Sequence, residues 1–196
     1  MRRVAALCLL SLAALGCKEQ APECDGVTID PSVQILAFGD LLLPPAGDEE
    51  DEEAETVDGP RVPAQKTIFL RARCGDALEI ERVCILHGGH NGDPEVRAFE
   101  FEGPGETTVV PGAEEAAIRV TYDARSLNGD LDFDGIPDPD IGTLIIQSNA
   151  VNAPTLAIPV CGRVINPGAG IAPQRCVLDS ELEIEAGERV EGLCDL

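Results

Sequence analysis

The sequence predicts an all-β protein in which two sheets pack face to face. Apolar residues occur in short alternating runs, as expected for strands with one buried face, and Gly, Pro, Asn and Asp separate these runs. No stretch has a convincing helical period. The run AEEAA at 113–117 follows Pro-Gly and continues into β-branched residues, so we assign it to a strand. With no Trp, one Tyr and five Phe, the core must be built from Val, Ile, Leu and Ala.

Seven strands are expected along the chain. They are VQILAF (33–38), KTIFLRAR (66–73), LEIERVCIL (78–86), VRAFEF (96–101), EAAIRVTY (115–122), GTLIIQS (142–148) and TLAIPVCGRV (155–164). This number of short strands predicts an immunoglobulin-like seven-stranded β-sandwich with long end loops. The segment CVLDSELEIEAG (176–187) offers an eighth strand beyond the sandwich.

The chain divides into a signal, one domain and two flanking segments. Residues 1–16 hold a basic MRR start and a 12-residue apolar run, which is typical of a secretory signal peptide and too short for the about 20 residues of a membrane span. Residues 17–29 are expected to form a lipid anchor and linker, residues 30–165 the sandwich, and residues 166–196 a cysteine-containing C-terminal tail.

The end of the signal resembles a bacterial lipobox. The residues ALGC precede the mature chain, and in that motif the cysteine becomes the lipidated first residue, so the resemblance implies lipidation of Cys17. Ala14 stands where the motif favours Leu, and ordinary signal cleavage nearby is the alternative. Lys18 in place of Asp implies sorting to the outer membrane. We therefore expect a protein held in the cell envelope by membrane-buried acyl chains.

The acidic composition limits the partners. The formal net charge is -22, and removing Arg2 and Arg3 leaves 12 basic residues against 36 acidic ones, or about -24 (12 − 36). Nucleic acid and anionic lipid are therefore excluded as expected partners. Seven acids among residues 48–55 predict an acidic disordered loop over 48–58, interpreted as a solvated spacer, with a cationic partner as the alternative.

Cysteine usage agrees with export. Of eight cysteines, Cys8 lies in the signal and Cys17 is the anchor, which leaves six, an even number that suits an oxidising compartment. Alternating strand directions predict three pairs, which are Cys24–Cys74, Cys84–Cys161 and Cys176–Cys194. The middle pair has a difficulty, because strand 142–148 is expected between its two strands and a disulfide needs Cα atoms within about 7 Å.

The order of motifs over about residues 30–165 resembles the Hydin-type immunoglobulin domain, often called choice-of-anchor D in bacteria. That family has Phe-Gly after its first strand, then Leu-x-Ile, Pro-Gly, Ser-Asn and a closing Gly. The matching residues here are Phe38, Gly39, Leu78, Ile80, Pro111, Gly112, Ser148, Asn149 and Gly162. Ala124 replaces a family Pro, and long insertions follow the first and fifth strands. The resemblance implies a binding or structural module and no reaction.

The same strand directions gather three long loops at one end. If the first strand runs away from an anchored N-terminus, then the acidic loop, the HGGH loop at 87–90 and the aspartate-rich loop at 130–141 all lie at the membrane-distal end. End loops on a rigid sandwich commonly carry function. We therefore expect an unknown protein or glycan partner at these distal loops.

The aspartate-rich loop has the spacing of a calcium site. In DLDFDGIPDPDIG (130–142) acids fall at positions 1, 3, 5 and 9, with a Gly at 6 and a backbone carbonyl at 7, as in an EF-hand loop. The pattern also resembles the thrombospondin type 3 calcium repeats. Position 12 is Ile rather than Glu, so Asp140 would substitute and calcium affinity should be weak, about 10⁻⁴ to 10⁻³ M. The expected ligands are Asp130, Asp132, Asp134, Ile136, Asp138 and Asp140. A plain acidic turn is the alternative.

Other chemistry has little support. Cys84, His87 and His90 have spacings that zinc could use, but two His in a Gly-rich loop are more simply polar turn residues, and Cys84 suits a disulfide. No G-x-S-x-G, S-x-x-K or HExxH motif occurs. We therefore expect a non-catalytic envelope lipoprotein with a calcium-binding loop. The alternatives are an accessory domain of an envelope enzyme or secretion complex, or an unrecognised hydrolase.

Overall fold

The computed structural model describes residues 25–42, 63–74, 77–104, 106–109, 114–124, 126–166, 176, 182, 184 and 188–195. The expected signal peptide, Cys17, the acidic loop and most of the eighth strand lie outside these residues.

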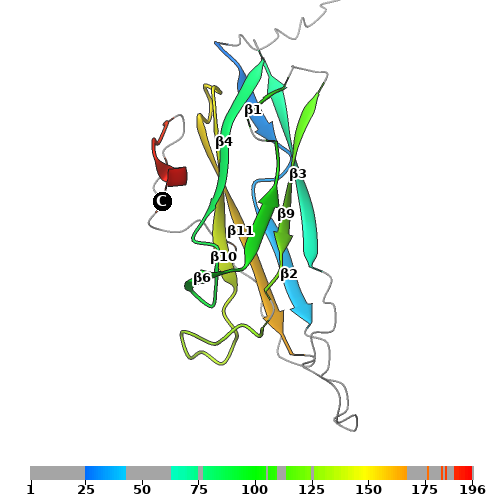
Figure 1. Cartoon of the computed structure of the whole chain (residues 1–196), viewed down its shortest axis with the longest axis vertical. Coiled ribbons are helices and arrows are strands. Elements are labelled where there is room, and N and C mark those ends of the chain that lie inside the picture. Colours follow the sequence, from blue (N-terminus) through cyan, green and yellow to red (C-terminus); the bar gives the residue numbers. More distant parts are fainter. Residues whose placement is uncertain are drawn as a thin grey trace, which may run out of the picture.

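Two sheets pack face to face (Figure 1). The first sheet is antiparallel throughout and has the order β1-β3-β9-β7. Its strands are β1 (Thr28–Pro31), β3 (Ala64–Arg73), β9 (Glu115–Tyr122) and β7 (Phe99–Glu102).

The second sheet has the order β2-β11-β10-β4-β8, with β2 parallel to β11 and the other pairs antiparallel. Its strands are β2 (Leu36–Leu42), β11 (Thr155–Ile165), β10 (Asp140–Ser148), β4 (Leu78–Leu86) and β8 (Thr107–Val109). A two-stranded ribbon of β5 (Gly89–His90) and β6 (Asp93–Arg97) and a 3₁₀ helix, η1 (Leu193–Asp195), complete the described elements.

The expected immunoglobulin-like sandwich is confirmed, with more strands than the seven expected. The short strands β1 and β8 add to opposite sheets, and the expected strand 96–101 divides into β6 and β7 at Ala98. The division has a backbone cause, since Ala98 N donates to Gly88 O and Ala98 O accepts from Asp123 N. These bonds replace ladder pairing at that residue.

The core fills the space between the sheets with aliphatic side chains. On β9 the alternate residues Ala116, Ile118, Val120 and Tyr122 are buried, and the facing strands supply a similar inward row. At one end the rings of Phe38, Phe99 and Tyr122 lie 5.0 to 6.1 Å apart between centroids. A Cβ on Gly162 would lie 2.6 Å from the Tyr122 ring, so this position must lack a side chain.

The expected grouping of loops at one end is confirmed for the described residues. Asp140 begins β10 beside the end of β9, whereas Val27 O accepts from Val151 N in the turn after β10. The nine residues of β10 separate these two ends by about 26 Å. β6 and the loop before β10 lie at the lower end in Figure 1, and β1 lies at the upper end.

The disulfides correct two expected pairs. Cys84 on β4 bonds Cys194, and Cys161 on β11 bonds Cys176, so the Cys84–Cys161 and Cys176–Cys194 predictions are wrong. The reason is that β10 lies between β4 and β11, which puts two strand spacings of about 4.8 Å between those strands. Cys74 is disulfide-bonded, but Cys24 lies outside the described residues, so the Cys24–Cys74 pair stays a prediction.

The described part of the tail is attached to the second sheet rather than closed on itself. Arg189 pairs with Glu81 on β4, Arg82 pairs with Asp195, and Val190 N donates to Thr155 Oγ1. The hydrogen bond from Arg189 lowers the pKa of the Glu81 carboxyl. Figure 1 shows η1 beside this sheet.

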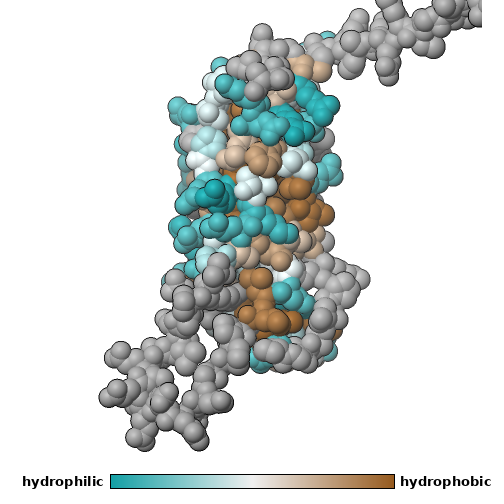
Figure 2. Space-filling view, turned by 90° about the vertical axis from the view of Figure 1, so that its right-hand side faces the viewer, coloured by the Kyte–Doolittle hydropathy of each residue, from teal (hydrophilic) through white to brown (hydrophobic). Residues whose placement is uncertain are grey.

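Apolar surface also remains outside the core. The face in Figure 2 carries brown apolar areas near its middle and its lower end, interrupted by hydrophilic residues. The exposed large apolar side chains of the described residues are Ile35, Leu42, Phe69, Val96, Leu131, Phe133 and Val151. Within the described part of the chain, no helix has the length and hydropathy of a membrane-spanning segment.

Candidate functional site

The loop between β9 and β10 is attached to the sandwich at both of its arms. On the entering arm, Asn128 N donates to Val164 O, and Asn128 Oδ1 accepts from Val164 N. On the returning arm, the buried Arg163 donates from Nη1 to Pro137 O, at 3.0 Å. The Arg163 guanidinium also binds both carboxylate oxygens of Asp40 on β2. Strands β2 and β11 thus fix where the loop starts and ends.

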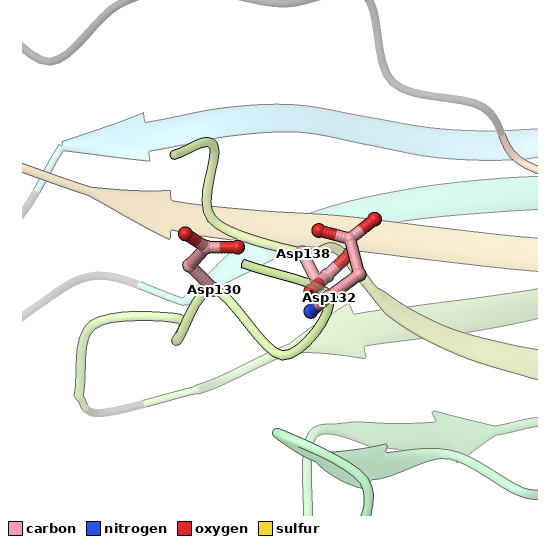
Figure 3. A group of neighbouring side chains, drawn as sticks. All are labelled: Asp130, Asp132 and Asp138. Atoms are coloured by element: carbon pink, nitrogen blue, oxygen red, sulfur yellow. Dashed lines mark hydrogen bonds between the residues drawn. The ribbon is translucent and has the colours of Figure 1, made fainter. Parts of the chain in front are cut away.

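Three of the predicted ligands come together in this loop. Asp130, Asp132 and Asp138 each offer a carboxylate oxygen, and these three atoms lie within 4.8 Å of one another. Figure 3 shows the three side chains on neighbouring turns of the loop.

Backbone N–H groups donate to all three of these carboxylates. The Asp138 carboxylate accepts from Leu131 N at 2.6 Å, and the Asp132 carboxylate accepts from Asp134 N at 3.2 Å. The Asp130 carboxylate accepts from Asp134 N and Gly135 N at 3.0 and 2.8 Å. Such side-chain to backbone bonds are the usual way aspartates shape a turn. Gly135 has a φ of +86°, which lets the chain reverse here.

Two other predicted ligands, Asp134 and Asp140, do not join the cluster, while the backbone carbonyl of Ile136 stays a prediction. Asp134 is not among the clustered groups, and its Oδ1 accepts from Ile136 N. Asp140 is a correction to the expected ligand set. Its side chain is fully buried in a separate hydrogen-bond network, because it already belongs to β10 rather than to the loop.

Neighbouring negative charges destabilise the ionised form of Asp132 in this cluster. The Asp134 N–H lowers the pKa of Asp132, but partial desolvation, the charges of Asp134 and Asp138 and a bond with Asp130 outweigh it. The pKa of Asp132 is therefore raised above its ordinary value. A hard cation such as Ca²⁺, which takes oxygen ligands, would offset this repulsion.

The alternate residues of the same loop point outward. Leu131 is 56 % exposed and Phe133 is 90 % exposed, and Phe133 has a φ of +61°. Large contiguous apolar patches mark interaction sites, whereas single exposed apolar side chains are common on protein surfaces. Sequence reasoning missed these two residues, although the alternation in DLDFD is visible in the sequence.

Asp140 lies at the centre of a second constellation. Its Oδ2 accepts from Tyr122 OH at 2.7 Å and lies 2.8 Å from His90 Nδ1. Its Oδ1 accepts from Asn128 Nδ2 at 2.9 Å and from Asn91 N at 2.8 Å. This network joins the β5–β6 ribbon, the end of β9 and the start of β10.

One of the two histidines differs from its sequence interpretation as a polar turn residue. His87 is exposed, with a φ of +53°, but His90 is buried and hydrogen-bonded at both ring nitrogens. The zinc alternative loses its thiolate, because Cys84 is in a disulfide. Sequence reasoning missed the partners of His90 because they lie 36 and 50 residues away.

No family model matches the chain, and no curated protein matches it. Among solved structures, it is similar to a Porphyromonas gingivalis W83 protein of unknown function, at 16 % identity and a TM-score of 0.45, over 72 % of this chain and 48 % of that one. The chain thus spans about half the length of that protein. It is also similar to the ASH/PapD-like domain 7 of human CEP192, at 12 % identity and a TM-score of 0.44, over 81 % of this chain and 99 % of that domain.

A third similar structure is the periplasmic chaperone SfaE, at 12 % identity and a TM-score of 0.34, over 76 % of this chain and 60 % of that one. These likenesses are distant. The class of protein is therefore defined by the strand order itself, which is that of an immunoglobulin-like sandwich.

Proposed function

We propose that this chain is a lipid-anchored binding or structural module of the bacterial cell envelope, of the Hydin type, whose distal loop is ordered by calcium. The family part is supported by the structural roles of the motif residues. Leu78 and Ile80 are core residues, Asn149 Oδ1 accepts from Glu79 N, and Gly162 makes room for Tyr122.

One observation carries the calcium part of the proposal. Three carboxylate oxygens from Asp130, Asp132 and Asp138 lie within 4.8 Å of one another in a loop whose backbone N–H groups donate to all three side chains. Oxygen ligands from a short loop with a Gly turn are the donor set that calcium uses. With three carboxylates rather than six ligands from the chain, water must complete the coordination, so affinity is weak.

The same loop also provides the proposed binding face. Calcium would hold the loop while Leu131 and Phe133 face outward, so a protein or glycan partner could cover these two apolar side chains. An N-terminal anchor at Cys17 would leave this face pointing away from the membrane, because Val27 lies at the opposite end of β10.

Calcium titration tests the site directly. Wild-type protein should bind calcium with a Kd of about 10⁻⁴ to 10⁻³ M by calorimetry. At 10 mM calcium and a Kd of about 10⁻³ M, the free energy of unfolding should rise by about 1.4 kcal/mol. Asp132→Ala should lose both effects. Glu114→Gln is the matched control, since it removes one exposed charge at the other end of the sandwich. Equal calcium responses in the two variants would contradict the site.

Mass spectrometry tests the anchor. Intact protein extracted from membranes should carry acyl chains on an N-terminus that begins at Cys17, and Cys17→Ala should be released into the soluble fraction. A mature form that starts elsewhere without lipid would contradict the lipoprotein part of the proposal and leave the calcium test unaffected.

A further inference from the structure

Three side chains outside the calcium loop cluster form a hydrogen-bonded relay. Ser126 Oγ lies 2.6 Å from His90 Nε2, and His90 Nδ1 lies 2.8 Å from Asp140 Oδ2. Ser126 is exposed, whereas His90 is 6 % exposed and the Asp140 side chain is fully buried. A serine at the surface thus directs its hydroxyl to a buried imidazole–carboxylate pair.

The network around Asp140 determines which ring nitrogen of His90 carries the proton. Asp140 faces donors at both oxygens, from Tyr122 OH and Asn128 Nδ2 among others, and as a carboxylate it can only accept. His90 Nδ1 must therefore donate to Asp140 Oδ2. His90 Nε2 then accepts, and two donors face its lone pair: the Ser126 hydroxyl at 2.6 Å and the more distant Asn91 Nδ2 at 3.1 Å. This tautomer is the one in which an imidazole can remove a proton from a serine.

Rigid elements hold the relay in position. Asp140 is the first residue of β10, and His90 ends β5, whose neighbour Asn91 donates from its backbone to Asp140 Oδ1. Asn91 Oδ1 accepts from Gly129 N, and Asn91 Nδ2 donates to Leu127 O. The segment that carries Ser126 is thereby tied to the turn that carries His90. A hydroxyl, a base that touches it and a group that orients the base are the first three parts of a site for nucleophilic catalysis.

We propose that Ser126 is a nucleophile that takes acyl groups from neutral, activated carboxylic esters, with His90 as its general base and Asp140 as the positioning residue. This goes beyond the proposed binding function and revises the expectation of a non-catalytic protein. A neutral substrate is specified because the neighbouring aspartates of the loop repel anions.

The reaction balances with water as the co-reactant. Ser126 Oγ forms a bond to the ester carbonyl carbon, and its proton moves to His90 Nε2. The carbon–oxygen bond to the leaving group breaks, and the leaving alkoxide takes the proton from His90 and departs as an alcohol. Water then attacks the acyl-serine, His90 accepts its proton, and the carboxylic acid leaves as Ser126 regains its hydrogen.

A fluorophosphonate probe tests the nucleophile, because it labels activated serines and releases fluoride without needing a fitted substrate pocket. Full-length protein should form a single adduct on the peptide that contains Ser126, located by mass spectrometry. Ser32, the other exposed serine among the described residues, has no imidazole beside it and instead accepts from Phe69 N. We expect labelling of Ser126 to be about 10² to 10⁴ times faster than labelling of Ser32, the usual contribution of a general base.

Variants separate a reactive relay from a purely structural one. Ser126→Ala should abolish the adduct and the hydrolysis of p-nitrophenyl acetate, while Ser32→Ala should keep both. His90→Gln should slow labelling at Ser126 by the same factor of about 10² or more. An adduct that is absent, or that forms at Ser126 no faster than at Ser32, would overturn the proposal.

Labelling of the wild-type protein as a function of pH provides a readout that needs no folded variant at His90. A general base needs a free lone pair, so labelling should slow as pH falls while the fold, followed by circular dichroism, stays intact. Asp140→Asn should change this pH profile as well as the rate, because the orienting charge is lost. A labelling rate that follows only hydroxide concentration, as for an ordinary serine, would overturn the proposal.

Discussion

At the scale of single residues, two aspartates eight positions apart have opposite environments. Asp140 is buried, and the donors around it satisfy both of its oxygens. Asp132 is exposed, and the charges of Asp134 and Asp138 help to raise its pKa. Asp140 contributes to the fold, whereas binding of a cation or a proton reduces the charge repulsion at Asp132.

Asp132→Asn should therefore remove a destabilising charge repulsion rather than a stabilising interaction. Because the pKa of Asp132 is raised, the native state binds the Asp132 proton more tightly than the unfolded chain does. The contribution of Asp132 to the free energy of unfolding therefore falls as pH rises from the ordinary pKa of 3.8 through the raised pKa. In chelator, the variant should lose this fall in stability and have a slightly higher Tm than wild type at pH 7. Thermal melts between pH 3.5 and 7 measure both effects.

In calcium the order should reverse, since wild type gains a ligand that the variant cannot hold. Glu114→Gln should behave like wild type in both conditions, because it lies at the other end of the sandwich. A lower Tm for Asp132→Asn in chelator would contradict the repulsion within the cluster.

At the scale of elements, β11 holds the distal end together through neighbouring residues. Arg163 binds Asp40 on β2 and Pro137 O in the loop, while Gly162 lets the Tyr122 ring approach the backbone. The Tyr122 hydroxyl in turn donates to Asp140. Packing at one backbone position is thus coupled to the geometry of the relay.

Gly162→Ala should destabilise the domain by overpacking. The added Cβ would meet three ring atoms of Tyr122 at 2.6 to 2.9 Å, and the ring is held by Phe99 and Phe38. The expected cost is about 1 to 3 kcal/mol in the free energy of unfolding, measured by urea denaturation. Gly103→Ala is the control, since its Cβ would lie 3.4 Å from Ile118, an ordinary contact. Equal stabilities for the two variants would contradict the close approach.

At the scale of the whole molecule, two disulfides attach the C-terminal tail to the second sheet. Cys84–Cys194 spans 110 residues and Cys161–Cys176 spans 15. The Cα atoms of the two pairs lie 5.7 and 5.5 Å apart, within the normal range for a disulfide. Salt bridges from Arg82 and Arg189 lie beside the longer link.

Removing the longer link should lower stability without disturbing the sheets. Cys84→Ser combined with Cys194→Ser should cost about 2 to 4 kcal/mol in the free energy of unfolding, because the unfolded chain regains freedom. Non-reducing peptide mapping of wild type should recover the peptides joined through Cys84 and Cys194. Recovery of Cys84 joined to Cys161 instead would contradict the strand order of the second sheet.

The sequence by itself determined the class of fold and most of the long strands, although the strand expected at 33–38 lies at Leu36–Leu42 as β2. Alternation of apolar residues is a local pattern, so the bounds of β4 and β9 were predicted without error, and those of β3, β10 and β11 within two residues. Strand directions alternate along a sandwich, so the gathering of loops at one end was also predictable. The aspartate spacing predicted three of the residues that cluster.

Only the tertiary structure decided which distant residues meet. The order β11-β10-β4 puts a strand between Cys84 and Cys161, and it therefore leaves both cysteines to the tail. The start of β10 takes Asp140 out of the loop and brings it to His90, fifty residues earlier in the chain. Sequence patterns report the neighbours of a residue along the chain, whereas these contacts depend on sheet order and on burial.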